Sequence, residues 1–267
     1  MKRTITMMLC LGLMVGCASV EKQGTPRETK EKLPGYLRAE RLPESVALIP
    51  APPAAGSTAF ALDEEISRAS LTLRDSPRWK LAARDAELSF PAAADSFTCA
   101  MEIRVSEQET PHLFRLMRRT MSDVSRSVAR AKNVYSRPRP FMANGEAICT
   151  PDYEKQMRKS GSYPSSHAAA GWAWALILSE VVPERGDAVL QRGRALGQSR
   201  IVCNVHWSSD VNEGRTVAAA VVARLHADPV FRADLELARA ELAALRAKGG
   251  APERDCAAEA DALAHYQ

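Results

Sequence analysis

The sequence predicts an all-α protein that folds as a single helical-bundle domain. Apolar residues recur at helical spacing along several long segments, and no stretch alternates between apolar and polar residues for long enough to predict a sheet. The chain has 267 residues, of which 46% are hydrophobic and 25% charged, a composition typical of a globular protein with a sizeable core. We therefore expect helices packed around one apolar centre.

The N-terminus has the layout of a secretory signal. In "MKRTITMMLCLGLMVGCASV" two basic residues precede an apolar run of about a dozen residues, which is too short to span a membrane. The ending "LMVGC" looks like a bacterial lipobox, so residues 1–16 are predicted to be a signal peptide and Cys17 the lipidated first residue of the mature chain. Ordinary cleavage nearby is the alternative. Either reading places the protein in the periplasm, and lipidation would anchor it to the outer membrane.

Three further regions follow along the chain. Residues 17–56 are rich in Pro, Lys and Glu and are predicted to form a tether or an extended arm. The main domain is predicted over 57–250, and 251–267 form a C-terminal tail. Apolar spacing and breaker residues predict helices over 63–75, 77–88, 110–135, 165–181, 184–198, 208–227 and 229–250. The apolar helix at 165–181 is expected at the centre.

Four cysteines lie outside the predicted signal: Cys99, Cys149, Cys203 and Cys256. An even number of cysteines in an oxidising compartment predicts two disulfides. Three pairings are compatible with the sequence. We favour Cys149–Cys203 with Cys99–Cys256, because the first bond would tie two candidate site loops together and the second would hold the tail.

Three short segments combine polar residues that have no obvious core role. They are "KNVYSRPRP", "GSYPSSH" and "SRIVCNVHWSSD", and their candidate residues are Lys132, Arg139, Ser165, Ser166, His167, Arg200, His206 and Asp210. Each segment taken alone has an ordinary interpretation: solvated cations at a helix end, a helix cap, or an incidental pair four residues apart. Their order and spacing carry the functional signal.

The three segments together match the motif of the phosphatidic acid phosphatase type 2 superfamily. That motif reads K-x6-R-P, then P-S-G-H, then S-R-x5-H-x3-D, and ten of its eleven specified positions agree with this chain. The sequence around these motifs, including "GQSR", "VHWSSDV" and "VVARLHADPVF", resembles the class A bacterial non-specific acid phosphatases over residues 48–246. The resemblance implies an all-α bundle and a phosphatase activity.

One position departs from the motif. Ser166 stands where the family has glycine. A serine keeps the backbone N–H that would face a phosphate, but it adds a side chain and tolerates a positive φ poorly. We expect activity to survive if the backbone φ at Ser166 is negative.

The residue types suit a phosphomonoester, which carries nearly two negative charges. Lys132, Arg139 and Arg200 are expected to surround its non-bridging oxygens and to neutralise that charge. Ser165 and the N–H groups of Ser166 and His167 would add donors at a helix N-terminus, where the helix dipole also favours an anion.

The resemblance also implies the roles of the acid–base residues. His206 matches the family nucleophile, and Asp210 is placed to hold the other ring nitrogen of that imidazole. His167 matches the residue that protonates the leaving oxygen and then activates water, so a protonated His167 and an acidic pH are expected. No cofactor is expected, and no metal, because the cations already supply the electrostatic stabilisation.

The expected partners are small-molecule phosphomonoesters. The net charge of +4 is spread along the chain, so nucleic acid is not indicated, and contact with a membrane is expected only through the lipid anchor. A homo-oligomer is compatible with the sequence. The alternatives to the phosphatase are a vanadate-dependent haloperoxidase, which shares the anion site, and a non-catalytic phosphate-binding lipoprotein.

Overall fold

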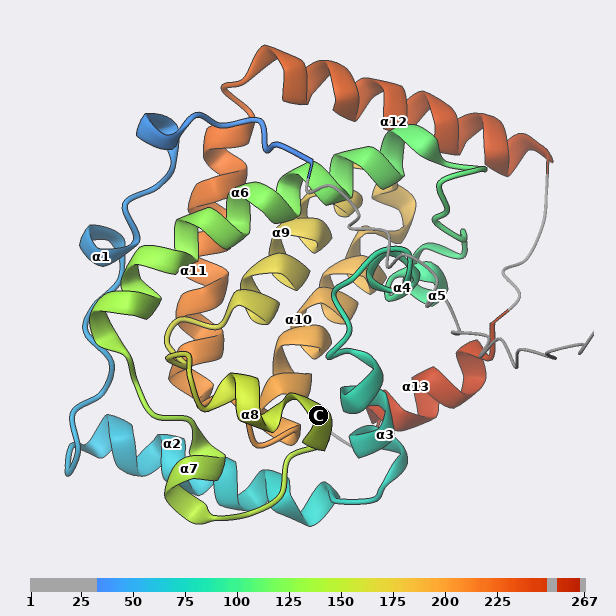
Figure 1. The fold of residues 1–267 in the computed structure, drawn as a ribbon. Coiled ribbons are helices and arrows are strands. Elements are labelled where there is room, and N and C mark those ends of the chain that lie inside the picture. Colours follow the sequence, from blue (N-terminus) through green and yellow to red (C-terminus); the bar gives the residue numbers. More distant parts are fainter. Residues whose placement is uncertain (1–32, 249–253, 265–267) are drawn as a thin grey trace, which may run out of the picture. The chain divides into compact units, whose positions relative to one another are not determined.

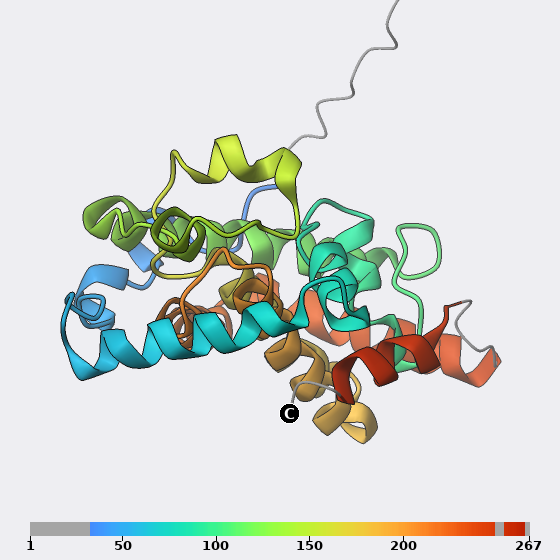
Figure 2. The ribbon, with the colours of Figure 1, turned by 90° about the horizontal axis from the view of Figure 1, so that it is seen from below.

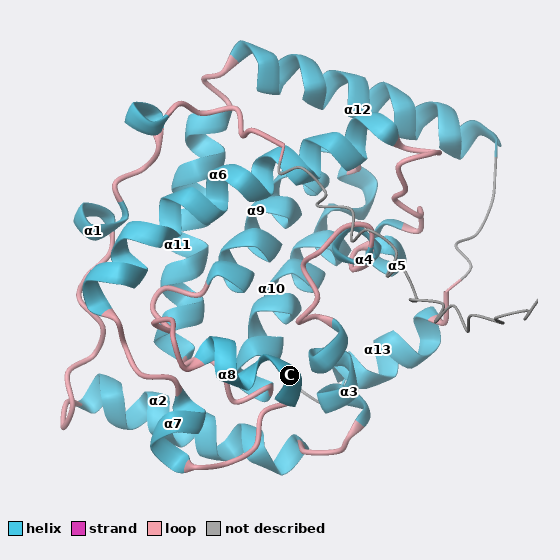
Figure 3. Ribbon diagram, in the orientation of Figure 1, coloured by secondary structure: helices cyan, strands magenta, loops and turns pink. Residues whose placement is uncertain are grey.

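The computed structural model describes residues 33–248 and 254–264, and within these ranges every regular element is a helix (Figures 1 and 3). The predicted all-α class is confirmed. The predicted signal peptide, the lipidated Cys17 and the first part of the arm lie outside the described residues. Within the described part of the chain, no helix is both long enough and apolar enough to span a membrane.

The centre of the bundle is α9, which spans Ser166–Val181. This helix is apolar on all sides, a pattern that requires burial around its whole circumference. It packs against four other helices, which Figure 1 shows around it: α6 (Pro111–Tyr135), α10 (Gly186–Val202), α11 (Ser208–Leu225) and α12 (Pro229–Lys248). The neighbouring helices therefore fix the position of α9 and of its N-terminal end.

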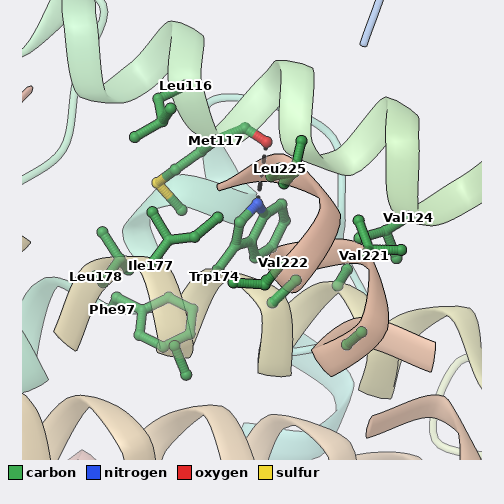
Figure 4. Packing of buried hydrophobic residues seen from close by; sticks show 14 of the residues in the cluster. Phe97, Leu116, Met117, Val124, Trp174, Ile177, Leu178, Val221, Val222 and Leu225 are labelled. Atoms are coloured by element: carbon green, nitrogen blue, oxygen red, sulfur yellow. Dashed lines mark hydrogen bonds between the residues drawn. The ribbon is translucent and has the colours of Figure 1, made fainter. Parts of the chain in front are cut away.

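Trp174 anchors the packing between α9 and α6. Its side chain is completely buried, and its indole Nε1–H donates a hydrogen bond of 3.0 Å to the carbonyl oxygen of Met117 (Figure 4). The bond satisfies the one polar group of the indole, so its large ring can be buried without an unpaired donor. Trp174 is therefore a core residue.

A glycine lets α11 approach the start of α9. A Cβ added at Gly214 would lie only 2.5 Å from the carbonyl oxygen of Ser165 and 3.2 Å from the Cβ of Ala168. The backbone N–H of Ser165 in turn donates to the carbonyl oxygen of Asp210 at 2.9 Å. The second and third motif segments are thus held against each other by backbone contacts.

The described part of the arm, residues 33–56, lies along α6 and includes the short helix α1 (Ser45–Leu48). Asp123 of α6 accepts hydrogen bonds from the backbone N–H groups of Tyr36, at 2.7 Å, and Leu37, at 3.2 Å. These bonds satisfy backbone donors of a segment that has no regular structure of its own.

The next helix, α2, spans Thr58–Ser70 and packs against α10 and α11 (Figure 2). It begins and ends about one turn earlier than the sequence predicts. Ser57 caps it by accepting the N–H of Phe60, and a short 3-10 turn over Leu71–Leu73 follows it.

The other helices are short: α3 (Pro77–Arg84), α4 (Ala92–Asp95), α5 (Thr98–Met101), α7 (Pro140–Asn144), α8 (Glu154–Met157) and α13 (Cys256–Ala264). The sequence predicts only α3 among them. The helices α4, α5, α7 and α8 have four or five residues, which are too few to show a helical period, and α13 lies in the segment predicted to be a tail. Both favoured disulfides are present: Cys99–Cys256 joins α5 to α13, and Cys149–Cys203 joins the loop after α7 to the end of α10.

Candidate active site

The three motif segments converge near the ends of five helices. Lys132 lies in the last turn of α6, Arg139 at the start of α7 and Ser165 at the start of α9. Arg200 lies in the last turn of α10, His206 in the loop that follows, and Asp210 in the first turn of α11. The polar side chains of the site thus come from the terminal turns of helices and from the residues that flank them.

Both ring nitrogens of His206 have partners. Nε2 lies 3.1 Å from Nη1 of Arg139, and Nδ1 lies 3.3 Å from Oδ2 of Asp210. A guanidinium can only donate, so Nε2 accepts and the ring proton is on Nδ1, facing the carboxylate. This is the tautomer in which Nε2 has a lone pair for nucleophilic attack.

Asp210 is completely buried and is held through both oxygens. Besides His206, Oδ2 accepts the backbone N–H of Trp207 at 2.8 Å, and Oδ1 accepts Nη1 of Arg137 at 2.8 Å. Burial raises the pKa of this carboxyl group, and the charge of Arg137 opposes the rise. Its orientation toward His206 is therefore set by donors on three sides.

Three cations lie around the imidazole of His206, and none of them has a carboxylate at hydrogen-bond distance among the residues that the structure describes. Lys132 Nζ donates to the carbonyl oxygen of Gly161 at 2.9 Å. Arg139 donates to a set of carbonyl oxygens, those of Val205 (2.9 Å), Met157 (3.1 Å) and Gly161 (3.2 Å). Arg200 is completely buried; within the described residues its hydrogen-bond partner is the sulfur of Cys203 at 3.9 Å, and its Nε has none.

Burial of these cations lowers their pKa values. The pKa of Lys132 falls to about 7 through burial and then through Arg139. Burial lowers the pKa of Arg139 to about 10, and burial followed by the charge of Arg139 lowers that of Arg200 to about 9. An anion placed among them would remove the electrostatic cost that these shifts reflect.

His167 lies in the first turn of α9, and its Nε2 is 3.0 Å from the carbonyl oxygen of Ala86. A carbonyl only accepts, so Nε2 carries the proton and Nδ1 is the basic nitrogen. Burial, followed by the charge of Arg200, lowers the pKa of His167 well below its usual value. The pKa of His206 is lowered in the same way, by burial and then by Arg139. Burial and the neighbouring cations thus disfavour the protonated His167 that the sequence suggests. A bound dianion would offset the effect of the cations.

The start of α9 accommodates the serine that replaces the family glycine. Ser166 is the first residue of the helix, and it is not among the described residues with positive φ. The side chain of Ser165 caps the helix by accepting the N–H of Ala168 at 3.3 Å. The N–H groups of Ser166 and His167 belong to the first turn, so they have no helical acceptor and are oriented as anion donors.

The structure reveals partners that the sequence analysis missed. Ser199, a motif position without a predicted role, donates to Asp85 at 2.6 Å and accepts from Arg78 at 2.9 Å. Asp85 also forms a buried ion pair with Arg192. Asp85 precedes Ala86, whose carbonyl oxygen binds His167, and Ser199 precedes Arg200. The hydrogen bond between Asp85 and Ser199 therefore connects the segments that carry two site residues. No sequence signal identified Asp85.

Two aromatic residues beside the motifs have structural partners. Tyr163 is buried and its hydroxyl donates to the carbonyl oxygen of Pro50 at 2.7 Å. Trp207 is buried as well, and its Nε1–H donates to Pro138 at 2.9 Å. These contacts indicate that both rings pack within the fold. In the described ranges no group of His, Cys, Asp or Glu side chains is arranged to hold a metal ion.

Known acid phosphatases are similar to this chain over most of its length. The family model of the PAP2 superfamily matches residues 120–233. A non-specific acid phosphatase of Providencia stuartii is 40% identical over 212 residues, which cover 79% of this chain and 86% of that protein. An acid phosphatase of Zymomonas mobilis is 40% identical over 76% of each chain. A non-specific acid phosphatase of Salmonella typhimurium is 39% identical over 73% of this chain and 78% of its own length.

Proposed function

Since the chain belongs to the class A bacterial non-specific acid phosphatases of the PAP2 superfamily and is thus an acid phosphatase, we propose that it hydrolyses many phosphomonoesters through a phosphohistidine on His206. The observation that carries this proposal is the set of three cations around His206 that contact carbonyls, sulfur and imidazole. Buried charges require a counter-charge. A phosphoryl group bound between Lys132, Arg139 and Arg200 would supply it.

The contrast with other buried arginines supports this reading. Arg192 is as buried as Arg200, yet it forms an ion pair with Asp85 and another with Glu259 at 3.2 Å. Such arginines already have their counter-charge and stabilise the fold. Arg200 has a sulfur contact in place of a carboxylate, and we assign it to the ligand.

In the first half-reaction Nε2 of His206 attacks phosphorus, and the ester P–O bond breaks. The guanidinium of Arg139 must first move from Nε2 to a phosphoryl oxygen, which frees the lone pair. Asp210 stabilises the positive charge that develops on the imidazole through the Nδ1–H bond. The leaving oxygen takes its proton from Nδ1 of protonated His167.

In the second half-reaction His167 is neutral and accepts a proton from water. The water oxygen attacks phosphorus, the P–N bond breaks, and His206 is regenerated with inorganic phosphate as product. An alcohol in place of water would give a phosphotransferase side reaction. The N–H groups at the start of α9 and the three cations stabilise the charge on the equatorial oxygens in both steps.

The test is turnover of p-nitrophenyl phosphate near pH 5–6 by the mature protein, with and without EDTA, beside the variants His206→Ala and His226→Ala. His226 is the matched control, because it pairs with Glu180 away from the motifs. We expect EDTA-resistant turnover in the wild type and the control, and a loss of at least about 10³-fold in His206→Ala. Undiminished turnover in His206→Ala would overturn the mechanism.

A second measurement tests the intermediate and the substrate range. Rapid denaturation of His167→Gln during turnover should trap an acid-labile, base-stable phosphoryl group, because water activation is slowed. A panel of sugar, aryl and nucleoside monophosphates should all be cleaved. Bromide oxidation that appears only with vanadate would favour the haloperoxidase alternative, and inertness in every assay the binding protein.

We also propose export to the periplasm, with Cys17 as the site of an outer-membrane lipid anchor. The signal-like N-terminus and the two disulfides are what supports this proposal. Mass spectrometry of the N-terminal peptide from a membrane fraction, beside Cys17→Ser, would test it. The proposed partners are soluble phosphomonoesters.

A further inference from the structure

Arg137 lies between Lys132 and Arg139 in the sequence, but its partners are of a different kind. Its Nη1 donates to Oδ1 of Asp210 at 2.8 Å, and its Nη2 donates to Oδ2 of Asp63 at 2.8 Å. All three side chains are buried. The guanidinium therefore bridges the carboxylate beside the nucleophile and a second carboxylate on α2.

We infer that Arg137 and Asp63 form a positioning pair for His206: Arg137 fixes the Asp210 carboxylate through Oδ1, so that Oδ2 points at Nδ1 of the imidazole. This inference rests on the proposed function for its kinetic consequences. The pair acts through Asp210 and does not touch the phosphoryl group.

Asp63 holds both Arg137 and the start of α11. Its Oδ1 accepts the backbone N–H of Ser209 at 2.8 Å, and its Oδ2 accepts the hydroxyl of Ser209 as well as Arg137. Ser209 immediately precedes Asp210, and its hydroxyl also lies 2.7 Å from Nη1 of Arg137. Asp63 therefore fixes the backbone next to Asp210 and the cation that binds its side chain.

The surroundings of Arg137 separate it from the phosphate-binding cations. Two carboxylates balance its charge, whereas Lys132 and Arg139 contact carbonyl oxygens. The rings of Trp207 and Phe60 lie 5.3 and 5.7 Å from its guanidinium carbon. These rings limit the access of water to the guanidinium. The bonds from Arg137 to the two carboxylates are charge-assisted, because donor and acceptors are ionised.

Loss of the guanidinium should act on the nucleophile and not on substrate binding. Without Arg137, Oδ1 of Asp210 is buried without that donor, and the carboxylate can rotate away from Nδ1 of His206. The imidazole can then place its proton on Nε2, the atom that must attack. The population of the reactive tautomer falls while the phosphate-binding cations remain.

The experiment is a double-mutant cycle with Arg137→Gln, Asp210→Asn and their combination. We expect Arg137→Gln to lower kcat about 10–100-fold and to leave KM within about threefold of the wild type. Losses of this size are typical when a residue that orients a metal ligand is removed, and Arg137 orients Asp210 in the same indirect way. In the Asp210→Asn background Arg137→Gln should lower kcat by less than about threefold, because the carboxylate that Arg137 positions is no longer present. Asp63→Asn, a milder change, should give a smaller loss of the same kind.

Arg119→Gln is the matched control. Arg119 pairs with Asp234 at 3.2 Å and stacks on Tyr36 away from the motifs, so its loss removes an arginine–aspartate pair without touching the site. We expect its kcat and KM to equal those of the wild type. Equal losses of Arg137→Gln in the two backgrounds, or a change confined to KM, would overturn the inference.

A spectroscopic readout keeps the inference testable whether or not the protein turns over substrate. In ¹⁵N-histidine NMR spectra the wild-type His206 should show a protonated Nδ1 and an unprotonated Nε2, and Arg137→Gln and Asp63→Asn should shift this balance toward Nε2–H. An unchanged tautomer in both folded variants would refute the positioning role. A wild type that shows the tautomer but no turnover would refute the proposed function alone.

Discussion

Lowering the pH from 7 to 5 should destabilise this protein markedly, because two imidazoles are buried among cations. Burial lowers the pKa of both His167 and His206 well below 6.5. Folding therefore favours the neutral rings. The stability that these rings contribute is complete above pH 6.5, the pKa of the unfolded state, and is lost as the pH falls toward the folded values.

The magnitude follows from proton linkage. A histidine that stays neutral when folded and titrates near pH 6.5 when unfolded loses up to about 2 kcal/mol of stability at pH 5. His206 is almost fully buried, while His167 is partly exposed and more strongly screened. We expect about 3 kcal/mol for the pair. Lys132 adds little in this window, because its pKa of about 7 places most of its effect at higher pH.

The assay is guanidinium unfolding at pH 7 and pH 5, with both disulfides intact, of the wild type and of the double variant His167→Gln/His206→Gln. The difference between the two proteins isolates the imidazoles from the other titrating groups. The wild type should lose about 3 kcal/mol more than the variant. Inorganic phosphate should reduce the loss in the wild type, because a bound anion favours the protonated rings. Parallel losses in the two proteins would refute the electrostatic account.

Three substitutions test other parts of the site. Arg200→Met should lower kcat/KM about 10³-fold and raise the free energy of unfolding by about 1–2 kcal/mol, because it removes a buried cation that has no carboxylate partner in the described part of the chain. Steady-state kinetics and denaturant unfolding check both signs, and lower stability would contradict the assignment. Ser166→Gly should leave kcat/KM within about threefold, because the serine has no positive φ to relieve, so a larger gain in activity would show that the serine is strained. Gly214→Ala should cost about 1–3 kcal/mol and lower kcat, because its Cβ would lie 2.5 Å from the carbonyl oxygen of Ser165. Gly186→Ala is the control for stability, because its added Cβ would lie 3.7 Å from its nearest neighbour, the Cβ of Ser179. Equal melting temperatures of the two variants would contradict the packing argument.

The motif residues could be predicted from the sequence because their order and spacing are specific to one superfamily. The long helices could be predicted because each shows a period of apolar residues over many turns. Four of the short helices carry no such period, and α13 lies in a segment that reads as a tail. Its place depends on Cys256, whose pairing with Cys99 spans 157 residues.

The positioning residues could not be predicted for a different reason. In "SRPRP" the motif spacing selects Arg139 and gives Arg137 no role, and only the fold shows that Arg137 binds the carboxylate beside His206. Asp63 is an unremarkable acidic residue in an amphipathic helix until α2 packs on α11, which places it beside a residue 146 positions away. The protonation of His167 likewise depends on charges that the linear sequence does not bring together.

The bond between Arg139 and Nε2 of His206 has a consequence for selectivity. In the proposed mechanism Nε2 is the attacking atom, and its lone pair is occupied by a hydrogen bond from Arg139 until another group competes for that guanidinium. A phosphoryl dianion does so by its charge, at the same place where it will be attacked. A neutral carboxylic ester or phosphotriester brings no such charge, so the hydrogen bond from Arg139 to Nε2 would remain and Nε2 could not attack it.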